Sequence, residues 1–254
     1  MVQQEKFMLK WLKELNQEEV KRVGGKAASL SAMLKEGFLV PNGFVLSFSN
    51  HTNDVDNYRW GIKSFYSQMG NNVSVAVRSS ASGEDGKEHS FAGQYSTYLN
   101  VNGWEGIVSA VKRCCFSLTN KRAQEYRESK GITGDNYMSV VVQEMVPARF
   151  SGVMFTKDPI TNDESKIYIE TTEGLGDKLV GGTVTPSLYV IEKKEFKVVE
   201  EHVTSGPRIF MVDLKALCNV GKDIEKFFKS PQDIEFCITK MGLPYIVQAR
   251  PITT

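Results

Sequence analysis

The C-terminal end of the chain constrains the fold most, because two short stretches there alternate as neighbouring β-strands do. Residues 233–239 (DIEFCIT) and 244–249 (PYIVQA) are rich in β-branched and aromatic residues, and residues 240–243 (KMGL) place a glycine-containing turn between them. The pattern predicts an antiparallel hairpin in which Thr239 faces Pro244.

This register places four polar residues in two cross-strand pairs on one face of the hairpin. Glu235 lies opposite Gln248, and Asp233 lies opposite Arg250. A carboxylate and an amide oxygen are ligands that Mg²⁺ accepts, and a guanidinium suits a phosphate oxygen. The alternative is a solvent-facing polar hairpin, which the apolar flanking residues disfavour: Ile234, Phe236, Ile238, Ile246 and Val247.

The rest of the chain is mainly helical in its first half and mainly β-structure in its second half. Apolar spacing predicts helices over residues 26–36, 104–130 and 223–229. Strands are expected at residues 7–11, 73–77, 94–101, 138–146, 151–156, 166–171, 188–191 and 196–203. Helices early and antiparallel strands late predict an α+β fold in two lobes, residues 1–137 and 138–254, rather than a doubly wound parallel sheet.

The composition excludes several classes of protein. The 31 Lys and Arg residues nearly balance the 30 Asp and Glu residues, so no bulk attraction to nucleic acid or to a membrane surface is expected. No apolar run approaches the roughly 20 residues that span a bilayer, and the N-terminal residues lack the apolar core of a signal peptide. The four cysteines lack zinc-site spacing, which favours reduced thiols in a cytoplasmic protein.

Three kinds of glycine-rich pattern are relevant to phosphate binding in this chain. The P-loop pattern is absent. Gly174-Leu175-Gly176 resembles a dinucleotide loop, but residues 181–182 (GG) and Pro186 would break the helix that such a loop needs. Gly24-Gly25-Lys26 stands at a predicted helix start, where backbone N–H groups, the helix dipole and a lysine favour an anion. A purely structural glycine turn is the alternative for this third pattern.

Two predicted strands end in polar residues that can bind a nucleotide. Residues 75–80 (VAVRSS) bring Arg78 to the end of a buried strand, and residues 81–90 form a small, polar loop that could cover a ligand. Residues 140–146 (VVVQEMV) could offer backbone hydrogen bonds to adenine, with Met145 packed on the ring. A surface hairpin with a solvated arginine and an ordinary core strand are the respective alternatives.

Five blocks, in this order, resemble a known family over nearly the whole chain. They read VGGKAASL…GFLVPNGFVLS, VAVRSSASGED…SFAGQYSTYLNV, VVVQEMVPARFSGVMFTKDP, IETTEGLGDKLVGGTVTPSLYVI and DIEFCITKMGLPYIVQARPI. They are similar to the N-terminal nucleotide-binding domain of the phosphoenolpyruvate synthase and pyruvate phosphate dikinase family, which includes rifampin phosphotransferase. The resemblance implies an ATP-grasp fold, with ATP held in the cleft between two lobes.

The resemblance also implies roles for individual residues around the phosphates. Lys26 and Arg78 match the family's phosphate-binding lysine and arginine, and Gly93 matches a residue close to the phosphates. Glu235 and Gln248 match the metal ligands, which implies Mg²⁺ as a cofactor beside ATP. The hairpin register, worked out without the family, selects the same two residues.

Further matches concern the nucleoside and the transferred group. Gln143, Glu144 and Met145 fall on the family's adenine-binding segment, and Glu170 falls on an acidic position near the nucleoside. Arg250 matches the arginine of the QARP motif. Because phosphoryl transfer depends on positioning and charge neutralisation, the expected catalytic residues are the three phosphate-binding cations, Lys26, Arg78 and Arg250.

In this family ATP reacts with a histidine on a swivelling domain and gives AMP, and a further domain passes the phosphoryl group to an acceptor such as pyruvate. His51, His89 and His202 lie in no motif like the family's TSHAA. The histidine and acceptor domains are therefore expected as partner proteins encoded nearby, or as parts of a longer chain; both stay open. A stand-alone ATP-grasp ligase or kinase that forms ADP, and a non-catalytic nucleotide-binding module, are the alternative functions.

Overall fold

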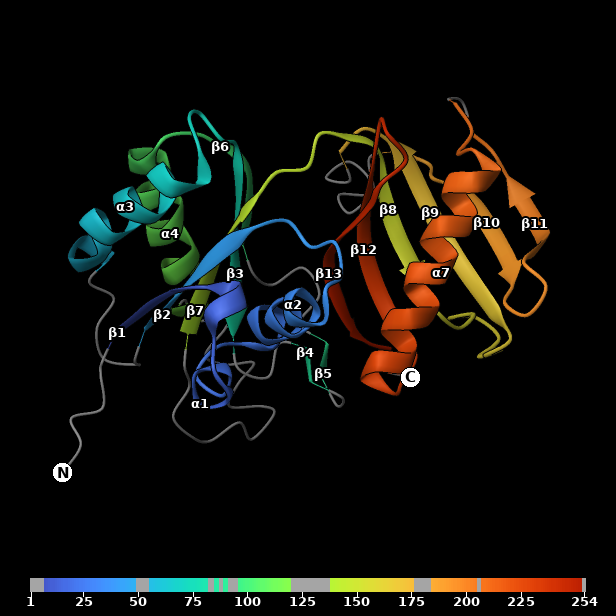
Figure 1. Cartoon of the computed structure of the whole chain (residues 1–254), viewed down its shortest axis with the longest axis horizontal. Coiled ribbons are helices and arrows are strands. Elements are labelled where there is room, and N and C mark those ends of the chain that lie inside the picture. Colours follow the sequence, from blue (N-terminus) through green and yellow to red (C-terminus); the bar gives the residue numbers. More distant parts are fainter. Residues whose placement is uncertain are drawn as a thin grey trace. The chain divides into compact units, whose positions relative to one another are not determined.

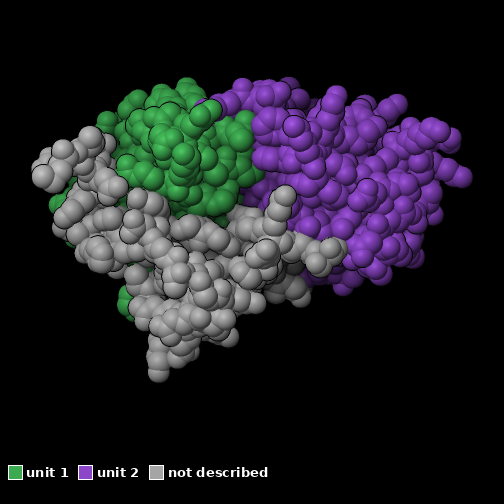
Figure 2. Space-filling view, turned by 90° about the horizontal axis from the view of Figure 1, so that it is seen from below, with its two compact units in different colours: residues 1–32, 41–145 green, residues 33–40, 146–254 purple. Residues whose placement is uncertain are grey.

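The computed structural model describes residues 7–48, 55–81, 85–86, 89–90, 96–119, 138–175, 184–204 and 207–252. The chain forms two compact units, coloured separately in Figure 2. Unit 1 comprises residues 1–32 and 41–145, and unit 2 comprises residues 33–40 and 146–254. This division differs from the expected boundary after residue 137, because the strand that follows this boundary belongs to the sheet of unit 1.

Unit 1 contains a five-stranded sheet in which every neighbouring pair is antiparallel (Figure 1). Its strands, in spatial order, are β1 (Phe7–Trp11), β2 (Gly43–Phe48), β7 (Met138–Glu144), β3 (Val75–Ala81) and β6 (Thr97–Val101). Strand β7 lies at the centre and reads MSVVVQE, so its run of buried valines suits a strand that is covered on both faces.

Helices cover both faces of this sheet. On one face, α3 (Arg59–Met69) and α4 (Trp104–Thr119) pack on a core that includes Val77 and Val142. On the other face, two serine hydroxyls of the sheet hold the start of α2 (Gly25–Glu36). Ser139 Oγ accepts from Gly24 N and Ser80 Oγ accepts from Ala27 N, each at 3.2 Å. These contacts fix the glycine–lysine turn against the sheet.

Short elements complete the described part of unit 1. The helix α1 (Gln17–Val20) begins at Asn16, whose side chain forms a capping box with Glu19. The other short elements are two 3₁₀ helices, η1 (Leu12–Glu14) and η2 (Val55–Tyr58), and two strands, β4 (Asp85–Gly86) and β5 (His89–Ser90), which pair as a small sheet. The predicted helix over residues 104–130 is described only as far as Thr119, where α4 ends.

Unit 2 contains a six-stranded antiparallel sheet (Figure 1). Its strands, in spatial order, are β11 (Lys197–His202), β10 (Ser187–Glu192), β9 (Lys166–Glu173), β8 (Ala148–Phe155), β12 (Gln232–Thr239) and β13 (Pro244–Pro251). The helix α7 (Met211–Phe228) packs on one face of this sheet.

The sequence-based prediction for α7 was wrong in length, since a helix was expected only over residues 223–229. The buried residues Leu214, Leu217, Cys218 and Ile224 continue one apolar face through Gly221. Glycine disfavours a helix interior, but here a Cβ atom would lie 2.5 Å from Met154 Cε. The glycine therefore serves close packing of the helix on the sheet.

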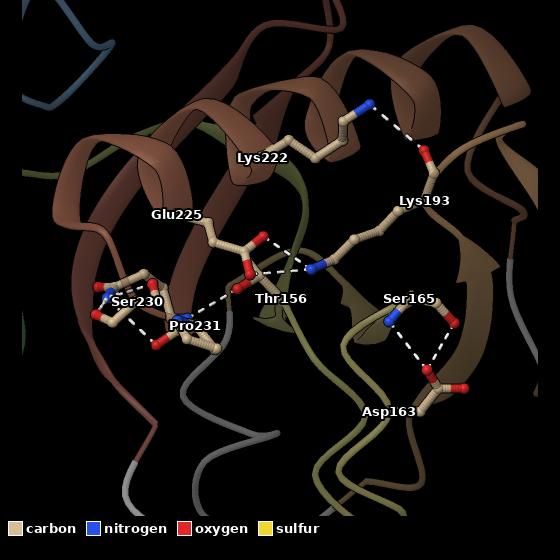
Figure 3. Close-up of polar contacts among 9 residues, drawn as sticks. Thr156, Asp163, Ser165, Lys193, Lys222, Glu225, Ser230 and Pro231 are labelled. Atoms are coloured by element: carbon tan, nitrogen blue, oxygen red, sulfur yellow. Dashed lines mark hydrogen bonds and ion pairs between the residues drawn. The ribbon is translucent and has the colours of Figure 1, made fainter.

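Polar contacts hold α7 to the strands around it (Figure 3). Lys193 Nζ, at the turn between β10 and β11, donates to both carboxylate oxygens of Glu225 at 2.8 and 3.0 Å. Beyond the C-terminal end of the helix, Gln232 N at the start of β12 donates to Oγ1 of Thr156, the residue after β8, at 2.8 Å, which joins these two neighbouring strands. Within the described ranges, no helix is both long and apolar enough to cross a membrane.

Candidate functional site

The hairpin formed by β12 and β13 has the predicted pairing in the part that lies away from its turn. Glu235 pairs with Gln248, and Asp233 pairs with Arg250. The prediction was wrong by one residue at the turn, where Ile238 rather than Thr239 pairs with Pro244. A β-bulge between Glu235 and Phe236 accounts for the difference, because it inserts one extra residue into β13. The pairs on the side of the bulge away from the turn therefore have the predicted register.

The sheet of unit 2 aligns a second carboxylate with this hairpin. Glu235 also pairs with Val153 of β8, and Val153 pairs with Glu170 of β9. Because directly paired residues share a face, Gln248, Glu235 and Glu170 project from the same side of the sheet. The opposite side carries Ile234 and Met154, and α7 packs there. The sequence linked Glu170 to the site by resemblance alone, and the pairing now gives a physical connection.

Asp233 and Arg250 form an ion pair next to this row. Arg250 Nε and Nη2 both lie 2.8 Å from Asp233 Oδ2. Burial raises the pKa of Asp233 above its usual range, the Arg250 guanidinium opposes the shift, and Glu235 adds to it. A guanidinium carries five N–H donors in a fixed plane, so the contact with Asp233 orients the donors that remain. Sequence analysis placed Asp233 opposite Arg250 but assigned it no role.

In unit 1, three predicted residues lie on the sheet face that holds α2. Arg78 shares this face with Ser80 of the same strand, β3, and Gln143 shares it with Ser139 of β7. Side chains an even number of residues apart in a strand project from the same face. Lys26, in the first turn of α2, is buried, and its Nζ donates to Ser79 O at 3.2 Å. Two cations thus lie near the helix N-terminus, and the amide of Gln143 lies four residues from Ser139 along β7 on the same face.

The side-chain amide of Gln143 leaves a buried donor on this face. Gln143 is 2% exposed, and its Nε2 has no hydrogen-bond partner among the residues that the structure describes. An unsatisfied buried donor costs about 1–3 kcal/mol. An acceptor atom on a bound molecule would remove this cost, and the purine nitrogens and ribose oxygens of a nucleotide are such acceptors.

Backbone contacts limit how the predicted adenine segment can act. Glu144 N donates to Asn42 O at 2.8 Å, and Met145 N donates to Ser74 O at 2.9 Å. Both N–H groups are therefore used within the protein, so they are not available to bind the adenine edge. Glu144 and Met145 are half-buried at the end of β7.

Several residues of the sequence-based prediction lie elsewhere or outside the described ranges. Gly93, His51 and residues 82–84 and 87–88 of the predicted covering loop are outside the described residues. His202 is an exposed residue of β11 whose Nε2 lies 3.0 Å from Glu200. The four cysteines are all buried and form no disulfide with one another.

The arrangement of strands and helices within the two units defines the structural class of the chain. Two units, each with an antiparallel sheet and packed helices, form the α+β ATP-grasp fold, as predicted. The chain is similar to a dinucleotide-forming acetyl-coenzyme A synthetase of Candidatus Korarchaeum cryptofilum, with a TM-score of 0.51, 11% identity, and 98% and 94% of the two chains covered. A protein from Pyrococcus horikoshii matches with a TM-score of 0.52, 14% identity, and 93% and 95% coverage.

The family follows from the sequence. Residues 56–216 and 207–254 match the model of the pyruvate phosphate dikinase AMP/ATP-binding domain, and the chain belongs to this family. A probable phosphoenolpyruvate synthase of Methanocaldococcus jannaschii is 33% identical over 96% of this chain and 26% of its own length. The phosphoenolpyruvate synthase of Aeropyrum pernix is 33% identical over 94% of this chain and 36% of its own length. The chain thus spans about a quarter to a third of these relatives, and the predicted family is confirmed.

Proposed function

We propose that this chain binds Mg²⁺-ATP and carries out the nucleotide half-reaction of a phosphotransferase. In this reaction a histidine nitrogen of another domain or protein attacks the β-phosphorus of ATP. The new N–P bond forms as the bond between the β-phosphorus and the α,β-bridging oxygen breaks. AMP leaves with that oxygen, and the imidazole loses its N–H proton to solvent. The product is a pyrophosphorylated histidine, and water or another acceptor must then remove its outer phosphate as the bond between the bridging oxygen and that phosphorus breaks. The phosphohistidine that remains serves an acceptor such as pyruvate on a further domain.

One observation carries the proposal: Gln248, Glu235 and Glu170 form a row on one face of the sheet, across the four strands β13, β12, β8 and β9. Carboxylate and amide oxygens at one end of the row suit a metal-bound phosphate group. A carboxylate further along suits the hydroxyl groups of a ribose. A nucleotide lying along this row would meet both.

The residues present fit Mg²⁺. Glu235 and Gln248 offer oxygen donors only, as this hard cation prefers, and they are too few to complete an octahedral shell. Phosphate oxygens and waters would complete it, which matches the way proteins usually bind Mg²⁺-nucleotides. When bound, the ion would neutralise phosphate charge and align the phosphate chain.

The chain's own cations would position the phosphates. The contact with Asp233 restrains the plane of the Arg250 guanidinium, so the ordering entropy of this arginine is already lost before a ligand arrives. Lys26 and Arg78 are both nearly buried beside the N-terminus of α2, whose dipole also favours an anion. We propose that Lys26 and Arg78 bind phosphate oxygens of ATP.

Calorimetry of ATP binding tests the proposal directly. Wild type should bind ATP in the presence of Mg²⁺. Glu235→Ala should lower the affinity at least about tenfold in Mg²⁺ and much less in EDTA, because the removed oxygen ligand acts through the metal. Lys215→Ala, on the exposed side of α7, is the matched control and should leave the affinity unchanged. Equal losses with and without Mg²⁺ would remove Glu235 from the metal site.

Product analysis separates the alternative functions. With the histidine-bearing part of a phosphoenolpyruvate synthase added, the proposal expects AMP and an acid-labile phosphorylated protein. ADP formed with a small acid and an amine would favour a stand-alone ligase. ATP binding without any turnover, with every candidate partner present, would favour a non-catalytic module. The separate partner proteins and the cytoplasmic location stay predictions.

A further inference from the structure

Two tryptophan rings are stacked on the surface of unit 1. Trp60, near the start of α3, is 75% exposed, and its ring centroid lies 6.4 Å from that of Trp104 at the start of α4, with 20° between the ring planes. Trp11, the third tryptophan of the chain, instead packs in the core against Phe44 and Phe65. An indole that stays this exposed gains little from folding, so its position calls for another reason.

Two cations lie over these rings. Lys63 Nζ is 5.4 Å from the ring centroid of Trp60 and 5.3 Å from that of Trp104. Arg59 Cζ is 5.5 Å from the centroid of Trp104. These four residues, Arg59, Trp60, Lys63 and Trp104, are called the tryptophan patch below. An indole face attracts a cation, and the ammonium group is thereby held beside an apolar surface.

Positive charge is in excess around the tryptophan patch. Asp56 accepts from Lys112 at 2.8 Å and lies 3.8 Å from Arg59, so one carboxylate serves two cations. Lys63 contributes to none of the ion pairs formed within the described residues. The exposed charged side chains of η2, α3 and α4 are Arg59, Lys63, Lys112 and Arg113 against Asp56 and Glu105. A ligand of this surface should therefore be acidic and should offer an apolar group to the indoles.

The tryptophan patch is not part of the candidate nucleotide site. The helices α3 and α4 cover the face of the unit 1 sheet that carries Val77 and Val142. Arg78 and Gln143 project from the opposite face, because neighbouring residues of a strand alternate between faces. An occupant of the patch would leave the nucleotide-binding face of this sheet uncovered.

We propose that the tryptophan patch is a docking surface for an acidic polypeptide segment that carries a large apolar side chain. The apolar side chain packs on Trp60, and an adjacent Asp or Glu pairs with Lys63. This chain covers 26% and 36% of two relatives, so the unmatched part of each is about two to three times as long as the matched part. The acidic segment is assigned to a region that corresponds to this unmatched part. Tryptophan and arginine are also the residues most enriched at the energetic centres of protein interfaces.

A peptide selection tests the proposal without knowledge of the natural partner. A phage-displayed peptide library is selected on the wild-type chain and depleted on the Trp60→Ala variant, and the enriched peptides are synthesised. The expected peptides carry a carboxylate next to an aromatic or branched aliphatic residue. Their affinity, measured by calorimetry, should fall at least about tenfold with Trp60→Ala and with Lys63→Glu.

Matched controls separate docking from bulk charge and from unfolding. Lys13→Glu makes the same charge change at an exposed lysine of η1 and should leave peptide affinity within about twofold. Because Trp60 is mostly exposed, Trp60→Ala should unfold at the same temperature as wild type and bind ATP as wild type does. Lost peptide binding with intact ATP binding would thus support the patch whatever the fate of the proposed catalytic function.

Other outcomes would overturn the proposal. Enriched peptides without carboxylates, or peptides that bind Lys63→Glu as tightly as wild type, would exclude an acidic occupant. Binding of a twelve-residue oligothymidylate that disappears in Trp60→Ala would assign the patch to nucleic acid instead. A wild-type dimer in sedimentation that becomes a monomer in Trp60→Ala would make a second copy of this chain the occupant.

Discussion

At the residue scale, the ion pair of Asp233 with Arg250 has the clearest consequence for function. An arginine at the end of a strand could adopt many rotamers, and two contacts of 2.8 Å to one carboxylate oxygen restrict it. The alternation of β12 and β13 predicted this pair, because both partners belong to one hairpin. The burial of Asp233, which raises its pKa, depends on strands and loops that the alternation does not reveal.

The cysteines give a prediction at the same scale. Burial raises the pKa of Cys115 and of Cys218 to about 12, so both are thiols rather than thiolates at pH 8. Since the thiolate is the nucleophile, iodoacetamide should modify these residues at least about a hundredfold more slowly in the native protein than in denaturant. Mass spectrometry after timed labelling measures the rates. Rapid native labelling that accelerates from pH 7 to pH 9 would show an ordinary, accessible thiol.

At the element scale, the approach of β8 to β9 depends on one glycine. Gly152 pairs with Thr171, and a Cβ atom on Gly152 would overlap the carbonyl oxygen of Glu170 and lie 2.9 Å from Thr171 Cα. Both are backbone atoms of a neighbouring strand and cannot move aside as a side chain can. The glycine thus brings Val153 and Glu170 into the register that aligns Glu170 with the hairpin.

Gly152→Ala should therefore destabilise the protein by about 1–3 kcal/mol, the usual cost of overpacking. Gly106→Ala is the matched control, because its Cβ would meet Val101 Cγ1 at an ordinary 3.4 Å within α4. The control should stabilise by up to about 1 kcal/mol, since alanine favours a helix over glycine. Urea unfolding measures both. Equal changes in the two variants would mean that the strands have room for a methyl group at Gly152.

The helix α7 shows why a prediction from sequence can misplace the bounds of an element. Residues 211–222, the first two thirds of the helix, were missed because Gly221 interrupts the apolar pattern and because glycine lowers helix propensity. Packing against Met154 reverses that preference, and no local signal records it. The bulge next to Phe236 was missed for a similar reason, since an inserted residue leaves the alternation on either side unchanged.

At the scale of the whole molecule, the proposed function assigns Lys26 of unit 1 and Glu235 of unit 2 to ATP binding, and each assignment can be tested separately. Mn²⁺ accepts the same oxygen ligands as Mg²⁺ and broadens NMR signals of nearby nuclei. Addition of Mn²⁺-ATP should broaden amide signals around Lys26 in unit 1 as well as those around Glu235 in unit 2. Mn²⁺ with the Glu235→Ala variant is the control and should broaden both sets less. Broadening confined to unit 2 would remove Lys26 from the nucleotide site.

The sequence by itself determined the family, the hairpin pairs of Glu235 and Asp233, and the α+β class. Each of these depends on residues close together in the chain or on motifs that stay recognisable in order. Tertiary structure alone decided that β7 lies at the centre of the unit 1 sheet and that Glu170 faces the same side as Glu235. The physical reason is that pairing between strands distant in sequence is set by packing across the whole sheet, and alternation within one strand fixes its two faces but not its neighbours.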